Sequence, residues 1–332
     1  MTALLGGRRG LAIGGLLLLA GIVLPRLIYP VFAFELLCWG LFAVSLDLLF
    51  GFAGLLSFGH ALFWGGSGYA ATIVLKYFHV PFLVALAAGL AYALLTAAIV
   101  GFVSIRRQGI YFAMITLAIA QIQYFFAFEL VGLTGGENGV QVPTRGWFFG
   151  FPIENDIAYY YLTLAFVALG VAFAIRVVRS PFGTVLTAMR ENERRAISLG
   201  YVTNNFKLAT FVMSGTLAGL AGSLFAIGNR LSGLDGVTWQ TSGKVVMMTV
   251  LGGIGTIFGP IIGAGLFESL EYFVSKTAVG DKTNVVLGAV FAAIVLVARR
   301  GIVGEILHAS MRRAPLREQA EPVHAAGTAE AS

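Results

Sequence analysis

The sequence predicts an all-α polytopic membrane protein with about ten transmembrane helices. Two observations support this fold class: 58% of the 332 residues are hydrophobic, and only 11% are charged. A soluble domain carries about a quarter charged residues, so the composition excludes an ordinary soluble protein. The apolar residues also gather in long runs, and a helix needs about 20 of them to cross the hydrocarbon core of a bilayer.

The apolar runs place the expected helices. They are predicted at 11–28, 32–50, 60–78, 81–104, 109–131, 158–178, 208–228, 243–258, 260–275 and 284–300. The first run follows two arginines, as in a secretory signal, but it ends in Pro25-Arg26 without a small-residue cleavage pattern, so we expect a retained helix. The runs 243–258 and 260–275 are short for full crossings; two short tilted helices or a re-entrant pair would both fit.

Lysine and arginine in the loops predict the orientation, because they concentrate on the cytoplasmic side. One face collects Arg8, Arg9, Arg106, Arg107, Arg176, Arg179, Arg190, Arg194, Arg195, Lys207, Arg299, Arg300, Arg312, Arg313 and Arg317. The other collects Arg26, Lys76, Arg145, Arg230, Lys244, Lys276 and Lys282. Both termini are therefore expected in the cytoplasm. Residues 1–310 form the expected transmembrane domain, and the tail 311–332, rich in Ala, Glu, Arg and Pro, is expected to be a disordered cytoplasmic segment.

A compact charged segment, Arg190–Gly200, interrupts the apolar chain inside an expected cytoplasmic loop at about 180–206. It carries charges of both signs at helical spacing and ends in glycine, which suits a short helix that contacts a soluble partner. An ordinary solvated charged loop is the alternative interpretation. The candidate contact residues are Arg190, Glu191, Glu193, Arg194, Arg195, Ala196, Leu199 and Gly200.

Glycine-rich stretches interrupt the helices in both halves of the chain, at Gly51–His60 and at Gly252–Gly259. Broken helices at membrane depth are tolerated only where protein or a watery cavity satisfies the freed backbone. Paired interruptions are typical of transporters built from two repeats, so a weak internal repeat is expected. Glycines at four-residue spacing, such as Gly215 and Gly219, are interpreted as packing ridges, with helix unwinding as the alternative.

Ionisable residues within the spans are rare, and Asp47 lies beside the first interruption. It is interpreted either as a functional group or as a helix-end carboxylate at headgroup level. Glu35, Glu268 and Glu271 are further acidic residues within spans. No phosphate-binding loop, catalytic constellation or metal spacing occurs, so we expect no catalytic residue, no cofactor site and no metal site. The net charge of +6 reflects membrane orientation rather than nucleic-acid binding.

Five segments together resemble one family. They are Gly51–Gly59 with His60-Ala61, Arg107–Ala118, Thr134–Gly139, Ser180–Gly183 continuing through Arg190–Gly200, and Leu251–Gly255 with Gly259-Pro260. In this order, over residues 35–300, they resemble the membrane permeases of branched-chain amino-acid (LIV-type) ABC transporters, specifically the LivM-like subunit.

The resemblance implies a type II ABC importer architecture in a bacterial-type plasma (inner) membrane. It implies as partners a LivH-like second permease, two cytoplasmic ATPases that bind ATP and Mg, an external solute-binding protein and membrane lipid. The charged segment resembles a divergent form of the coupling motif E-A-A-x-x-x-G: Ala196 and Gly200 match, whereas Arg194 and Arg195 replace the first two positions. Such a segment would transmit ATPase motion as a rigid element.

The resemblance also locates an expected translocation path. Its candidate residues are Gly51, Gly54, Ser57, Gly135, Gly136 and Asn138, with Asp47 as a supporting polar group. A stand-alone secondary transporter or channel using Asp47 is the alternative function, and a membrane-embedded enzyme is a remote one. Branched-chain amino acids, other amino acids, urea or short amides, and aromatic acids all remain open as solutes.

Overall fold

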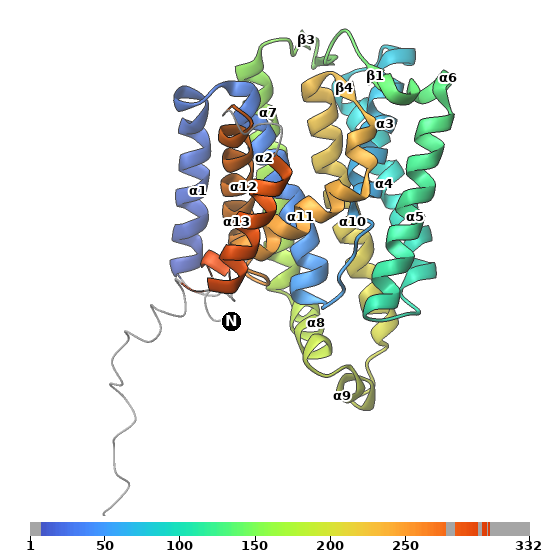
Figure 1. The fold of residues 1–332 in the computed structure, drawn as a ribbon, viewed down its shortest axis with the longest axis vertical. Coiled ribbons are helices and arrows are strands. Elements are labelled where there is room, and N and C mark those ends of the chain that lie inside the picture. The colour runs from blue at the N-terminus through green and yellow to red at the C-terminus, as the bar shows by residue number, and fades with distance from the viewer. Residues whose placement is uncertain (1–7, 277–282, 298–300, 304, 306–332) are drawn as a thin grey trace, which may run out of the picture.

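The computed structural model describes residues 8–276, 283–297, 301–303 and 305. The predicted tail 311–332 lies outside these residues, as do Lys282, Arg299, Arg300, Arg312, Arg313 and Arg317. The described part is a bundle of helices that run mostly along one axis (Figure 1). The expected class, an all-α multi-pass membrane protein, is confirmed at this level.

The helices in chain order are α1 (Arg8–Leu27), α2 (Pro30–Asp47), the π-helix η2 (Leu48–Phe52), α3 (His60–Phe78), α4 (Phe82–Ser104), α5 (Ile110–Glu129), α6 (Val131–Thr134), η3 (Gly136–Asn138), α7 (Asp156–Val178), α8 (Pro181–Glu191), α9 (Glu193–Ser198), α10 (Thr203–Asn229), η4 (Leu234–Val237), α11 (Trp239–Gly252), α12 (Phe258–Ser275) and α13 (Thr283–Val297). The strands are β1 (Val140–Gln141), β2 (Trp147–Phe148), β3 (Phe151–Pro152) and β4 (Leu231–Ser232). Each apolar run that predicts a helix contains one. The eighth predicted helix, 243–258, differs in extent from the observed α11, which starts earlier, at Trp239, and ends at Gly252.

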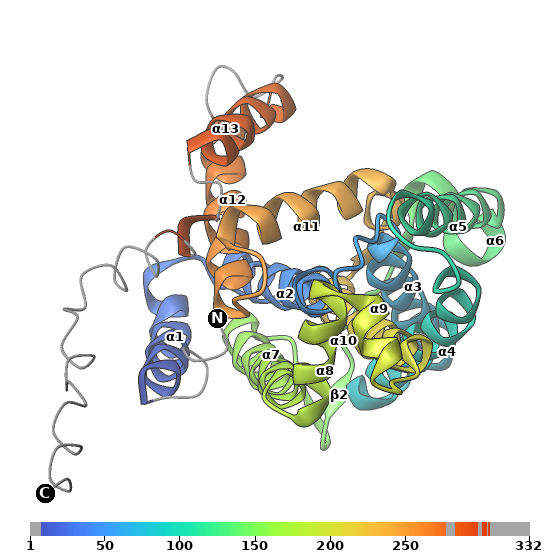
Figure 2. The ribbon, with the colours of Figure 1, turned by 90° about the horizontal axis from the view of Figure 1, so that it is seen from below.

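Five helices in the described residues are long and apolar enough to cross a membrane by length and composition: α2 with η2, α4, α5, α7 and α10. Helix α11 has 14 residues, a length of about 21 Å, against a hydrocarbon core of about 30 Å. Figure 2 looks along the bundle and shows α11 lengthwise, crossing obliquely between α12 and α5. It is therefore a short helix that is strongly tilted relative to the bundle.

Helices α2 and α10 form the centre of the bundle, since most of their residues are buried, whereas about a third of the residues of α4 and α7 are buried. Glycines let α10 approach its neighbours closely. A Cβ at Gly219 would overlap Ala93 of α4, and one at Gly222 would overlap the backbone of Trp64 in α3. The packing interpretation of the α10 glycines thus agrees with their surroundings.

The first glycine interruption is a break between α2 and α3. Helix α2 ends in the π-helical turn η2, residues 53–59 are irregular, and α3 begins at His60. Protein groups satisfy part of the exposed backbone: Ser242 Oγ accepts from the amide of Ala61 at 2.9 Å, and Ser57 Oγ accepts from the amide of Gly59 at 3.2 Å. Irregular backbone inside a membrane protein requires such partners.

The connections at the two ends of the bundle differ. At one end, α6, η3 and two small antiparallel strand pairs, β1–β4 and β2–β3, form an elaborate cap, while α8 and α9 lie at the opposite end (Figure 1). Arg145 anchors the cap, because its guanidinium pairs with Asp156 at 2.7 Å and its Nε donates to Gly228 O at 3.0 Å. We call these ends the cap end and the coupling end.

Candidate functional site

The charged segment Arg190–Gly200 is not the single helix expected, because it contains the last two residues of α8, a break at Asn192, and the separate short helix α9. Pro181 occupies the first turn of α8, where a missing N–H costs nothing. Asn192 separates the helices and caps α9, since its Oδ1 accepts from the amide of Arg195 at 3.0 Å. Gly200 follows α9 with a φ of 90°, a left-handed conformation that suits a glycine after a helix end.

Glu193 and Ala196, two of the residues expected to contact an ATPase, are partly or fully buried within the chain. Glu193 pairs with Lys207 of α10 at 2.5 Å, and the Lys207 side chain is only 4% exposed. Ala196, another candidate contact residue, is only 4% exposed, so this structure does not present its side chain to another subunit. The other candidates, Arg190, Glu191, Arg194, Arg195, Leu199 and Gly200, are exposed.

Arg190 ties the end of α8 to the interruption after α2. Its Nη1 donates a hydrogen bond to the carbonyl oxygen of Gly51 in the π-helical turn. Its Cγ also lies so close to Gly54 that a Cβ there would approach it to 3.0 Å. A π-turn frees a backbone carbonyl from regular helical bonding, and here the charged segment takes up that acceptor.

Asp47 joins the first interruption to the second. Its side chain is fully buried; Oδ1 accepts from the amide of Gly255 at 2.6 Å, and Oδ2 accepts from the amide of Ile257 at 3.2 Å. Ile257 has a φ of 55°, which is unfavourable for a β-branched residue and needs support from its surroundings. Asp47, Gly51, Arg190, Gly255 and Ile257 together are called the inner junction.

A buried polar chain lies next to the inner junction. His60 Nε2 and Ser214 Oγ lie 2.9 Å apart, and Ser214 Oγ donates to Ser45 O at 2.5 Å. This chain of hydrogen bonds links the start of α3 to α10 and to α2. His60 is thus a structural hydrogen-bonding residue here, and in the described residues no group of three His, Cys, Asp or Glu could hold a metal ion.

The residues expected along the translocation path do not form one site. Gly51, Gly54 and Ser57 follow α2 towards the coupling end, whereas Gly135, Gly136 and Asn138 belong to the cap end (Figure 1). Gly135 and Gly136 have φ values of 76° and 56° and form a tight turn. The two groups therefore lie on opposite sides of the bundle, and Asp47 faces backbone amides rather than an open path.

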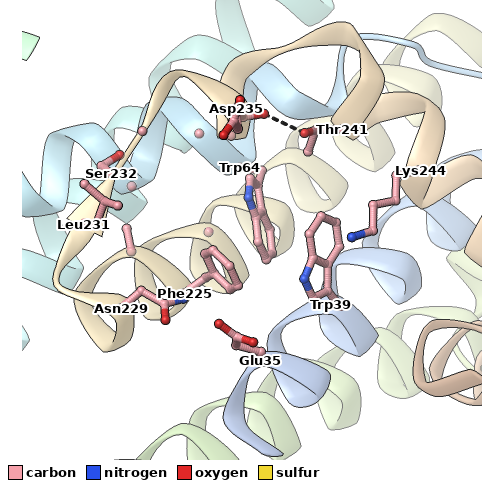
Figure 3. Close-up of a pocket in the computed structure, with 16 residues that line it drawn as sticks. Glu35, Trp39, Trp64, Phe225, Asn229, Leu231, Ser232, Asp235, Thr241 and Lys244 are labelled. Carbon is pink, nitrogen blue, oxygen red and sulfur yellow. Dashed lines mark hydrogen bonds between the residues drawn. The ribbon is translucent and has the colours of Figure 1, made fainter. Parts of the chain in front are cut away.

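A cavity of about 490 Å³, lined by residues of α2, α3, α10 and α11, reaches β4 at the cap end. Its apolar wall consists of Trp39 from α2, Trp64 from α3 and Phe225 from α10 (Figure 3). The Trp39 and Trp64 rings stack with centroids 4.7 Å apart, and the Trp64 and Phe225 centroids are 5.0 Å apart. We call it the aromatic cavity.

The polar side chains that line the aromatic cavity are those of Glu35, Asn229, Ser232, Asp235, Thr241 and Lys244 (Figure 3). The Nζ of Lys244 lies 4.3 Å from the Trp39 ring centroid. It also pairs with Glu268 at 2.6 Å and with Glu271 at 2.7 Å, both on α12. A single cation thus holds two carboxylates from the neighbouring helix.

Sequence reasoning did not find the aromatic cavity. Its walls come from four helices that are distant in the chain, and no short motif marks them. A partial signal existed in the acidic residues within spans, because Glu268 and Glu271 lie three apart on one helix face and Glu35 lies one turn before Trp39. Trp39, Trp64, Phe225 and Lys244 carried no signal of their own.

Known proteins share the chain's sequence pattern. Residues 31–298 match the family described as "Branched-chain amino acid transport system / permease component". The High-affinity branched-chain amino acid transport system permease protein LivM of Escherichia coli is 30% identical over 67% of this chain and 57% of its own length. That of Salmonella typhimurium is 32% identical over 67% of this chain and 58% of its own length.

A more distant relative is the Probable branched-chain amino acid transport permease protein LivM of Methanocaldococcus jannaschii, 26% identical over 69% of this chain and 76% of its own length. The chain spans less than two thirds of the two bacterial relatives. No solved structure matches it significantly. Because the family pattern covers residues 31–298, from α2 through α13, the chain belongs to the family of permease components of branched-chain amino acid transport systems.

Proposed function

We propose that the chain is a permease subunit of an ATP-driven ABC importer. It would form half of a translocation path for branched-chain amino acids or related small polar solutes, delivered by an external binding protein. The single observation that carries this proposal is the family match over residues 31–298, combined with a charged, exposed segment at one end of the bundle. The printed names of the relatives, which are transport permeases, support the same class.

The proposed topology has ten crossings of type II character, built on a weak internal repeat. The five longer spans would be joined by α1, α3, α11, α12 and α13 to make ten, with α11 crossing only part of the bilayer. The coupling end would face the cytoplasm of a bacterial inner membrane, with both termini on that side. The cap end would then face the binding protein.

The proposed mechanism uses contacts at the coupling end. Two cytoplasmic ATPases, which bind ATP and Mg, would push α8 and α9 through Arg194, Arg195 and Leu199. The hydrogen bond from Arg190 to Gly51 and the Glu193–Lys207 ion pair would pass this displacement to α2 and α10. A LivH-like permease would supply the other half of the path.

Helix α11 offers a rigid connection between the two sites. Its carboxyl end continues into Gly255 and Ile257 of the inner junction, while Thr241 and Lys244, near its start, line the aromatic cavity. A shift at Asp47 would therefore reach the cavity through one helix. Coupling of this kind requires an element with two arrangements that both sites bias.

Affinity purification of the chain from its membrane in mild detergent tests the proposal. We expect nucleotide-binding subunits and a second permease to co-purify, with vanadate-sensitive ATP hydrolysis. A chain that emerges alone and inactive, while a control transporter complex stays intact, would contradict it. The stand-alone secondary transporter using Asp47 would then be the next candidate, although the burial of Asp47 on two amides does not favour it.

A further inference from the structure

The aromatic cavity has the size and composition of a small-molecule site. Its volume of about 490 Å³ falls within the range of about 300–1,000 Å³ that is usual for ligand pockets. Aromatic rings form one wall and a few polar groups converge on it, as in such pockets generally. It reaches β4 and Gly233 near the cap end, and α11 connects it to the inner junction.

The charges around the cavity do not balance. Lys244 is the single Lys or Arg among the described lining residues, and its ammonium group is already paired with Glu268 and Glu271. Glu35 and Asp235 add two more carboxylates to the lining. The side chains of Lys244 and Glu268 are 20% and 12% exposed, so water screens them only in part. A cationic ligand would compensate this excess of negative charge.

The aromatic wall lies next to the acidic group. Glu35 is four residues before Trp39 on α2, and the two side chains border the same space (Figure 3). Asn229 from the end of α10 flanks Glu35. Indole rings bury apolar groups, so Trp39 and Trp64, which border the cavity, suit the apolar part of an amine whose ammonium group lies at Glu35.

A ligand carboxylate would find less support. With Lys244 held by two glutamates, the described lining residues offer it no unpaired cation. It would also approach Glu35 and Asp235, and like charges in a partly buried site repel.

We infer that the aromatic cavity binds the primary ammonium group of an apolar amine at Glu35, with Trp39 and Trp64 packing on its apolar part, and that it does not require a carboxylate on the ligand. The ligand class is thus primary amines with a small apolar side chain, whether or not they are amino acids. That the cavity lies on a transport path rests on the proposed function.

Three ligands with the same branched side chain test the inference: leucine, leucinamide, which lacks the carboxylate, and 4-methylpentanoate, which lacks the ammonium. Each is titrated calorimetrically into the complex purified through this chain, in lipid nanodiscs without ATP or binding protein. We expect leucinamide to bind at least as tightly as leucine, and 4-methylpentanoate to bind about tenfold or more weakly, since a bond to a charged group is lost. Equal or tighter binding of 4-methylpentanoate, or no binding of leucinamide, overturns the inference.

Glu35→Gln tests the residue. We expect it to weaken leucinamide binding about tenfold or more, with Glu129→Gln, an exposed glutamate at the end of α5, as the matched control. Unchanged affinity for leucinamide in a folded Glu35→Gln complex overturns the assignment of Glu35 as the ammonium-binding residue. If that variant does not fold, the comparison of the three ligands on the unmodified complex still tests the inference. If ATPases co-purify but the complex binds no amine, the inference is refuted and the proposed function is not. If the chain binds amines but no ATPase co-purifies, the proposed function is refuted and the inference is not.

Discussion

Asp47 at the end of α2 accepts a hydrogen bond of 2.6 Å from the amide of Gly255, 208 residues further along the chain. Through this bond the two glycine interruptions lie against each other. The carboxylate also accepts from Ile257 at 3.2 Å, so a single buried side chain satisfies two amides of the turn between α11 and α12. Removing it would leave the buried amide of Ile257 and the partly buried amide of Gly255 without that acceptor.

We therefore expect Asp47→Ala to destabilise the protein, by about 1–3 kcal/mol for each buried amide left unpaired. Asp47→Asn retains one carbonyl oxygen and should lose less. Thermal unfolding in detergent, followed by the loss of the monodisperse peak, ranks the variants. If Asp47 instead carries protons in a stand-alone transporter, Asp47→Asn would keep its stability and abolish pH-driven uptake.

Gly51 is the position where the inner junction has no room for a side chain. A Cβ there would overlap Asp47 Oδ1 and lie 2.6 Å from the Gly255 amide nitrogen. Gly51→Ala should displace the carboxylate and cost about 1–3 kcal/mol, as overpacking does. Gly265→Ala on α12 is the control, because a Cβ there meets nothing within 4 Å, and alanine should stabilise that helix slightly. Equal stability of the two variants would contradict the close approach.

The longer helices of this bundle could be predicted from sequence because a long apolar run determines each of them locally. The stretch 60–78 is an example: the predicted and observed bounds coincide at His60–Phe78. Helix α11 was harder, because Thr241, Gly243 and Lys244 dilute its apolar pattern, and the expected range ran past Gly252 into the turn.

The sites depend on contacts between distant segments, which sequence patterns do not specify. Asp47 was singled out as an ionisable residue in a span, yet its partners are backbone amides that any residue could supply. The proposed path residues near Gly51 and Gly135 were grouped by resemblance alone, and the bundle places them at opposite ends. The aromatic cavity needed the packing of four helices, which no local pattern encodes.

Arg194 and Arg195 are exposed at the coupling end, where an ATPase would bind. Replacing both by Glu reverses two charges, and we expect ATPase co-purification to fall by at least about tenfold, equivalent to about 1.4 kcal/mol. Membrane insertion should not change. Arg106→Glu with Arg107→Glu applies the same charge reversal to exposed arginines between α4 and α5 and serves as the control. Normal co-purification and transport in the Arg194, Arg195 variant would refute the coupling role.

The Glu193–Lys207 ion pair should hold α9 against α10. Because the Lys207 side chain is only 4% exposed, Glu193→Gln leaves a buried ammonium group without its counter-ion, whereas Glu193→Gln combined with Lys207→Met removes both charges. A double-mutant cycle on unfolding should give a coupling energy of about 0.5–3 kcal/mol. Additive effects of the two substitutions would show that the pair does not secure the coupling segment.

Lys244 should matter for the packing of α11 against α12 through its two carboxylate partners. Lys244→Met leaves Glu268 and Glu271 facing each other without a cation; breaking a fully buried pair costs about 3–5 kcal/mol, and we expect less here because the Glu271 side chain is 34% exposed. Combining it with Glu268→Gln and Glu271→Gln removes all three charges, and replacing a buried ion cluster as a whole is often close to neutral. We therefore expect the single variant to unfold at a lower temperature than the triple variant, measured by thermal unfolding in detergent. A triple variant as unstable as the single one would mean that Lys244 stabilises the helices through its cation–π contact with Trp39 rather than through its two carboxylate partners.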